Sequence, residues 1–332
     1  MEFIKELEEK AKKNNRTIIL PEALDERILK AAEYISKKNI ANIILLGNKE
    51  KILKKARELS LIFNERIYIL DYLAKENEEK FLKIVDIFYE LRKEKGITKK
   101  EAKEILKDEI YYACMLLKLK IADGVVGGAV HKTKDIIKPA LQIIKTKKES
   151  KLVSAYFLID TNNKNFGENG IFFMADCGLN IDPSDEELAE IAIESSKTFK
   201  KIFNKEANIA CLSFSSFKSA KSSSTEKVIN AVNLVKKKSD KINISGEMQL
   251  DTAIIKEVAE KKAPGDNVAG KANLLIFPNL DAGNIGYKMA SYMSGGKAYG
   301  PLLQGINMPI NDLSRGSSVE EIIGVILITL IS

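Results

Sequence analysis

Short apolar runs alternate with segments of helical periodicity along the first half of the chain. Apolar runs of four or so residues predict buried strands, and the segments between them carry apolar residues at helical spacing. Strands are expected at 17–20, 43–46, 66–70 and 125–126, and helices at 25–34, 76–95, 98–119 and 134–146. Strands that are separated by helices are typical of a mostly parallel sheet covered on both faces. The first half therefore predicts an α/β fold.

The same alternation resumes after a polar break at 147–150 (KKES). Strands are expected at 152–159, 171–174, 208–214, 242–245 and 274–277, and helices at 183–203, 225–238, 251–262 and from a cap at Asp281. The first two of these strands are joined by an Asn- and Gly-rich segment, which is typical of a hairpin-like connection. We expect a second α/β region to begin at this break.

The stretch Gly295–Glu321 is dense in turn-formers and in groups that bind anions. Its glycines, at 295, 296, 300 and 305, predict backbone N–H groups that a ligand can approach closely. A Ser314-Arg315-Gly316 turn then follows a short apolar run, and Ser318 with Glu321 forms a capping box before an apolar helix. This order places a fixed cation beside the positive end of a helix, where phosphate is stabilised. A turn and a cap without a ligand is the alternative interpretation.

Composition narrows the classes of function. The net charge is +7, from 53 Lys and Arg against 46 Asp and Glu, and the lysines are spread over helical stretches. Aromatic residues are 7% of the chain, which disfavours a nucleic-acid groove. The three cysteines suggest neither a disulfide framework nor a metal site, and a single histidine disfavours a Ser-His triad. We interpret His131 as a loop or cap residue.

The amino-terminal segment is charged and amphipathic, which is not the pattern of a signal peptide. No apolar run reaches about 18 residues, the length that a membrane helix needs. Together with the cysteine pattern, these features predict a protein of a reducing compartment, the cytoplasm, with no membrane partner.

Several long segments resemble phosphate acetyltransferases and occur in one order from about Pro21 to the end. They are LRKEKG (91–96), GGAVHKTKDIIKPALQIIKT (127–146), ADCGLN (175–180), PGDNVAGKANLLIFPN (264–279), FPNLDAGNIGYK (277–288) and GPLLQGINMPINDLSRG (300–316). The resemblance implies two α/β/α domains similar to the isocitrate and isopropylmalate dehydrogenases, with the active-site cleft between them. Residues 1–149 with a returning segment 301–332 would form domain I, and 150–300 domain II.

The resemblance also implies the reaction. An acetyl group would pass reversibly between acetyl phosphate and coenzyme A, in acetate metabolism, by direct thiolate attack in a ternary complex. Coenzyme A is then a substrate, and no metal and no permanently bound cofactor are expected. A homodimer without a nucleic-acid partner is the expected assembly.

Three residues match polar positions of the family's active site. Arg315 would grip the phosphate, since a planar guanidinium binds two oxygens at once. Ser314 would donate a hydrogen bond to the acetyl carbonyl or to the phosphate. Arg92 matches a second active-site arginine, although a cation that ends a helix is an alternative interpretation.

Three further residues either differ from the residue that the family has at that position or have an alternative interpretation. Glu321 stands where the family has an aspartate that acts as general base towards the thiol, and it could instead only complete the capping box. Lys138 stands where the family has an arginine. The lysine keeps the positive charge but lacks the planar guanidinium that binds two oxygens at once. Cys177 aligns with a cysteine near the coenzyme A site, and a small buried hydrophobic residue is the alternative.

Three other functions compete with this one. A phosphate butyryltransferase-like enzyme would use the same groups on a longer acyl substrate. Metal-dependent oxidation of a 2-hydroxy acid on the same scaffold would need clustered metal ligands and a dinucleotide loop, and the sequence shows neither. A non-catalytic basic module that binds RNA or an acidic partner would show a strong salt dependence of binding.

Overall fold

The computed structural model describes residues 2–332. The chain forms two compact units, which are described separately. The first contains the chain up to Lys145 together with Ile306–Ser332, and the second is Thr146–Gly305. The expected division into domain I (1–149 with 301–332) and domain II (150–300) stays a prediction.

The first unit is built on a five-stranded parallel sheet in the order β11-β4-β1-β2-β3. The strands are β1 (Thr17–Leu20), β2 (Asn42–Leu46), β3 (Ile67–Leu70), β4 (Gly124–Gly127) and β11 (Ile310–Asp312). The last strand comes from the far end of the sequence, and its register sets Asp312 opposite Gly127. The segments after all five strands therefore meet at one edge of the sheet.

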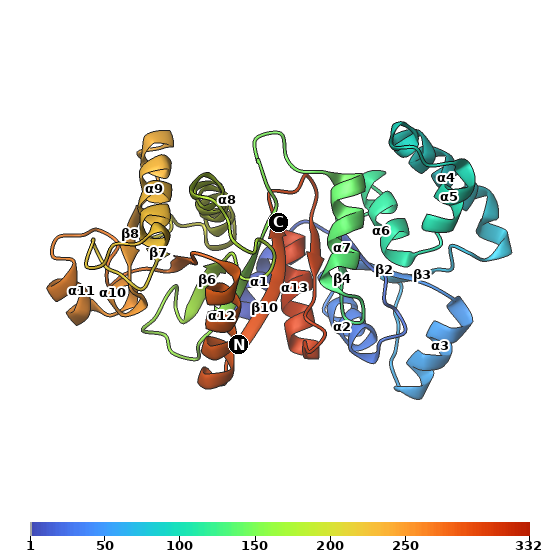
Figure 1. Cartoon of the computed structure of the whole chain (residues 1–332). Helices are drawn as coiled ribbons and strands as arrows, with labels where there is room; N and C mark the ends of the chain where they lie inside the picture. Colours follow the sequence, from blue (N-terminus) through green and yellow to red (C-terminus); the bar gives the residue numbers. More distant parts are fainter. Residues whose placement is uncertain (1) are drawn as a thin grey trace. The chain divides into compact units, whose positions relative to one another are not determined.

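Helices cover this sheet. They are α1 (Glu2–Lys12), α2 (Glu26–Lys37), α3 (Lys49–Glu58), α4 (Glu78–Arg92), α5 (Lys99–Ile105), α6 (Glu109–Lys118), α7 (Thr133–Pro139) and α13 (Val319–Ile331), with single turns η1 (Lys75–Asn77), η2 (Lys93–Lys95) and η3 (Ala140–Ile144). The red α13 packs against the blue α1 and α2, although it ends the chain (Figure 1). Its side chains from 322 to 330 are buried, so it forms part of the core of this unit. Among residues 2–332, none of the helices has the length and apolarity that crossing a membrane requires.

The prediction of one helix over 98–119 is wrong, because the chain forms two helices there. Asp108 separates α5 from α6, and its Oδ1 accepts the N–H groups of Ile110 at 2.9 Å and Tyr111 at 3.1 Å. A side chain that accepts these two N–H groups is an N-cap, and it starts a new helix where helical periodicity alone predicts continuity.

The second unit is built on a six-stranded mixed sheet in the order β10-β5-β6-β9-β7-β8. Its strands are β5 (Ser154–Asp160), β6 (Ile171–Ala175), β7 (Ile209–Leu212), β8 (Ile244–Met248), β9 (Leu274–Ile276) and β10 (Lys297–Gln304). Its helices are α8 (Asp185–Phe203), α9 (Ser223–Lys238), α10 (Leu250–Ile254), α11 (Lys256–Lys262) and α12 (Leu280–Ser294). β5 and β6 are antiparallel neighbours, as the hairpin-like connection predicts. The helix expected over 251–262 is interrupted at Ile255, and α12 is capped by Asn279 rather than by Asp281.

The glycine-rich segment at 295–305 does not form the expected anion loop. It contains β10, which pairs with β5, and the N–H groups of Gly295 and Gly296 donate to Tyr292 O and Ser291 O. A Cβ on Gly296 would lie 1.7 Å from the carbonyl oxygen of Asp160. These glycines therefore permit close packing of backbone within the second unit.

Candidate active site

The Ser314-Arg315-Gly316 turn lies between a strand and a helix start, as predicted. β11 ends at Asp312, and Ser318 caps α13 by accepting the N–H of Glu321 at 3.2 Å. In return Glu321 Oε2 accepts the N–H of Ser318 at 2.8 Å, so the predicted capping box is confirmed. The three residues of the turn are exposed to solvent.

The side chains of this turn are suited to holding an anion. Within residues 2–332, no hydrogen bond or ion pair engages the Arg315 guanidinium. Among the described residues, Ser314 Oγ accepts only a long 3.4 Å hydrogen bond, from the Gly316 N–H. A guanidinium, a hydroxyl and the positive end of α13 therefore stand together and retain their capacity to bind oxygen atoms.

Arg27 fixes the backbone of the turn. Its Nη1 donates to the carbonyl oxygens of Arg315 at 2.7 Å and Ser317 at 3.0 Å. Its Nη2 donates to Ala129 O and to Asp25 Oδ2, each at 2.8 Å. The Asp25 carboxylate raises the pKa of Arg27 by this side-chain hydrogen bond. One half-buried cation thus ties the turn to the start of α2 and to the loop after β4.

The loop after β4 is organised by Glu22, which follows β1. The Glu22 side chain is 1% exposed, and it accepts the N–H groups of Ala129 at 2.6 Å and of Val130 and His131 at 2.9 Å each. Its Oε1 also lies 2.8 Å from His131 Nδ1. His131 is therefore more than the loop or cap residue that the sequence suggests, because it forms a pair with a buried carboxylate.

The structure also adds Asp312, which is fully buried at the end of β11. Neither of its carboxylate oxygens has a hydrogen-bond partner within residues 2–332. Burial raises the pKa of Asp312 to about 7, and the charge of Arg315 opposes that rise. A partly protonated carboxyl group therefore lies just before the turn.

Sequence reasoning missed Arg27, Glu22 and Asp312. A signal was present for Glu22 and Asp312, since a charged residue that closely follows or ends a predicted strand in a parallel α/β sheet lies at the ligand-binding edge. Arg27 carries no such signal, because it lies on α2. The sequence does not tell which of these groups bind one another.

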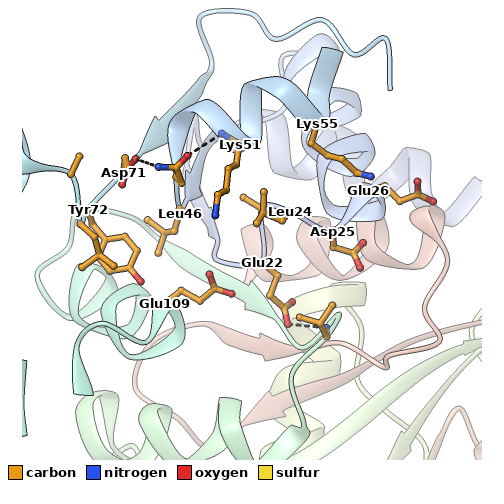
Figure 2. A pocket seen from close by; sticks show the side chains of 16 residues that line it. Glu22, Leu24, Asp25, Glu26, Leu46, Lys51, Lys55, Asp71, Tyr72 and Glu109 are labelled. Atoms are coloured by element: carbon orange, nitrogen blue, oxygen red, sulfur yellow. Dashed lines mark hydrogen bonds between the residues drawn. The ribbon is translucent and has the colours of Figure 1, made fainter. Parts of the chain in front are cut away.

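A pocket of about 930 Å³ lies in the first unit, along the carboxyl ends of β1, β2 and β3. Leu24, Lys51 and Tyr72 line it, and Figure 2 shows Glu109 beside Glu22 at its base. Burial raises the pKa of Glu109 to about 7, with the charge of His131 opposing the rise. No group of three or more His, Cys, Asp or Glu side chains in residues 2–332 is arranged to hold a metal ion.

The other site candidates of the first unit lie on helices. Lys138 is exposed on α7, which packs against β11. Arg92 ends α4, and its charge lowers the pKa of Tyr111, which burial otherwise raises. No hydrogen bond in the described chain links Arg92 to the turn at 314–316, so both of its interpretations stay open.

Cys177 belongs to the second unit and is completely buried there. Burial raises the pKa of its thiol well above the usual range. A thiol in such surroundings is unreactive, because the thiolate is the nucleophilic form. In this structure Cys177 has no surface that a ligand could contact.

The chain is similar to phosphate acetyltransferases over its whole length. A model of the family described as phosphate acetyl/butaryl transferase matches residues 2–330. The phosphate acetyltransferase of Acetivibrio thermocellus is 48% identical over 329 residues, which are 99% of this chain and 97% of that protein. That of Bacillus subtilis is 45% identical over 323 residues, covering 97% and 96%.

A solved structure agrees. The phosphotransacetylase of Streptococcus pyogenes is 38% identical and superposes with a TM-score of 0.88, over 99% of this chain and 97% of that one. The α/β fold that the resemblance implies is thereby confirmed. Sequence and structure together show that the chain belongs to the phosphate acetyl/butaryl transferase family.

Proposed function

We propose that this chain transfers an acetyl group reversibly between acetyl phosphate and coenzyme A. Its similarity to enzymes named phosphate acetyltransferase supports this activity. One observation at Arg315 carries the proposal for the site. Its guanidinium makes no hydrogen bond or ion pair within residues 2–332, and its backbone carbonyl is held by Arg27. A guanidinium on an anchored backbone and without a partner of its own is suited to binding the phosphate of acetyl phosphate and to stabilising that phosphate as it leaves.

The proposed mechanism is direct transfer in a ternary complex. The coenzyme A thiolate attacks the acetyl carbonyl, and the bond between the carbonyl carbon and the phosphate oxygen breaks. Arg315 binds two phosphate oxygens, and Ser314 donates a hydrogen bond to the carbonyl or to the phosphate. Lys138 and Arg92 supply further positive charge for the substrates, and Cys177 stays a non-essential neighbour of the coenzyme A site.

The remaining proposals follow the resemblance. Coenzyme A acts as a substrate, and no cofactor is permanently bound. The enzyme works as a homodimer in the cytoplasm, without a nucleic-acid or membrane partner.

A comparison of acetyl and butyryl phosphate as substrates tests the choice of acyl group. Thioester formation is followed by absorbance at the same coenzyme A concentration. We expect kcat/KM to be at least about tenfold higher for acetyl phosphate, since each added methylene is typically worth about 10–200-fold in a fitted pocket. Equal or faster turnover of butyryl phosphate would instead support the longer-chain alternative. Thioester formation from neither substrate would contradict the proposed reaction itself.

Replacing Glu321 with glutamine tests the proposed general base. We expect kcat to fall about 10²-fold or more, since general-base catalysis is typically worth about 10²–10⁴. Glu321→Asp, which keeps a carboxylate, should retain most activity. Ser318→Ala is the matched control, because it removes a cap worth about 1 kcal/mol but leaves the carboxylate in place. A loss under about tenfold in Glu321→Gln would reduce this residue to its part in the capping box.

A further inference from the structure

The pair formed by His131 and Glu22 has the geometry of an oriented proton-transfer group. Glu22 is buried and held by three backbone N–H groups, so its carboxylate cannot turn away from the ring. It engages His131 Nδ1 at 2.8 Å, while the imidazole keeps 26% of its surface exposed. Nε2 is therefore the nitrogen that remains for a ligand, and a carboxylate on the opposite nitrogen fixes the tautomer.

This pair lies at the same sheet edge as the phosphate-binding turn. His131 follows β4 and Arg315 follows β11, and these two strands are parallel neighbours with Gly127 opposite Asp312. Arg27 donates to carbonyl oxygens of both segments, at Ala129 and at Arg315. The imidazole and the guanidinium are thus held on two adjacent loops that one side chain ties together.

The reaction needs a proton at the phosphate. When the carbon–oxygen bond of acetyl phosphate breaks, its electron pair stays on the phosphate oxygen, and an unprotonated phosphate trianion is a poor leaving group. Arg315 can stabilise the charge but cannot supply the proton, because a guanidinium is not deprotonated in proteins. The groups assigned to the substrates so far therefore lack a donor for the leaving oxygen, and the carboxyl group of Asp312 is fully buried.

We propose that His131, oriented by Glu22, is the general acid that protonates the departing phosphate. As the sulfur–carbon bond forms and the carbon–oxygen bond breaks, the Nε2 proton passes to the freed oxygen and hydrogen phosphate leaves. The thiol proton goes to the general base, and solvent restores the proton of the imidazole. In the reverse reaction neutral His131 takes the proton back. This inference rests on the proposed function, since it assumes phosphate at Arg315.

The surroundings of the ring favour this role. Burial lowers the pKa of His131, but the hydrogen bond and charge of Glu22 and the charges of Glu109 and Asp108 outweigh it, so the pKa is raised overall. The charged groups of the neighbouring elements are Glu22 after β1, Arg27 on α2, Asp108 and Glu109 at the start of α6, and Asp312 at the end of β11. A raised pKa means more imidazolium at neutral pH. The rate of thioester formation should then decline as the pH rises through that pKa, and the rate of the reverse reaction should increase.

The first test needs no variant of the histidine. His131 is the only histidine in the chain, so the titration of its ring resonances by NMR, in untagged protein, reports one pKa. Saturating inorganic phosphate should raise this pKa by about half a unit or more, because an adjacent dianion favours the imidazolium. Arg315→Gln should abolish the shift. If phosphate binds in a manner that depends on Arg315 but leaves the His131 pKa unchanged, the role of His131 is overturned and the proposed function is not. If phosphate does not bind at all, the proposed function itself is contradicted.

The second test is the pH profile of His131→Gln. We expect kcat to fall about 10²-fold with KM within about threefold, and the alkaline decline of thioester formation to disappear. Glu22→Gln keeps an acceptor for the loop but removes the charge, so the decline should move to lower pH. Lys134→Gln, an exposed change of equal charge nearby, should leave rate and profile unaltered. Glu109→Gln should retain the decline, which excludes Glu109 as its source. A His131→Gln enzyme that keeps the alkaline decline would overturn the inference.

Discussion

Replacing Arg315 with glutamine should lower kcat/KM for acetyl phosphate about 10³-fold, since removing one preorganised donor to a developing oxyanion typically costs about 10²–10³ and here a full charge is lost as well. The free energy of unfolding should stay within about 0.5 kcal/mol, the usual range for a surface substitution. The guanidinium makes no hydrogen bond or ion pair within residues 2–332, and only its backbone carbonyl is used, by Arg27. Steady-state thioester formation and urea unfolding measure the two quantities.

Two further variants separate charge from geometry at this position. Arg315→Lys keeps the charge but loses the fork, so it should recover only part of the lost activity. Arg57→Gln removes an exposed arginine from α3 and should leave kcat/KM unchanged. A loss of less than about tenfold in Arg315→Gln would show that the phosphate is held elsewhere.

Local signals in the sequence predicted well where the Ser314-Arg315-Gly316 turn lies, between a strand and a capped helix. A capping box is defined by four consecutive residues. The apolar run before Ser314 and the apolar helix after Ser318 are likewise recognised from residues that are close in the sequence. Each therefore needs no knowledge of the tertiary structure. The same reasoning explains why β1 and most other strands of the first sheet were found close to their observed bounds.

Long-range partners explain what the sequence left undetermined. The segment 297–304 forms a strand because β5, far earlier in the chain, offers it a pairing edge, and its glycine and proline hide that tendency. Arg27 and Arg315 are 288 positions apart, and Glu22 and His131 are 109 apart. Side-chain type and spacing cannot reveal such pairs. The structure could show them because the parallel order of β11, β4 and β1 brings all four residues to one edge.

The second large effect is expected at Gly128, which begins the loop that carries His131. Its φ is +105°, and a Cβ there would lie 2.0 Å from Asp312 Oδ1 and 2.7 Å from the backbone nitrogen of Leu313. Gly128→Ala should therefore lower the free energy of unfolding by about 3–5 kcal/mol, because backbone strain and overpacking add. It should also reduce kcat/KM, since the collision displaces the residues that lead into the turn at Arg315.

Gly96→Ala separates the two contributions. Gly96 has a φ of +83°, but a Cβ there would meet nothing within 4 Å. Its replacement should cost about 1 kcal/mol, the strain of a left-handed conformation alone. Urea unfolding gives both values if the dependence on denaturant is unchanged. If Gly128→Ala and Gly96→Ala lower the free energy of unfolding equally, Asp312 and Leu313 can move away from the added methyl group. The turn at Arg315 would then be joined to the sheet less rigidly than its contacts with Arg27 indicate.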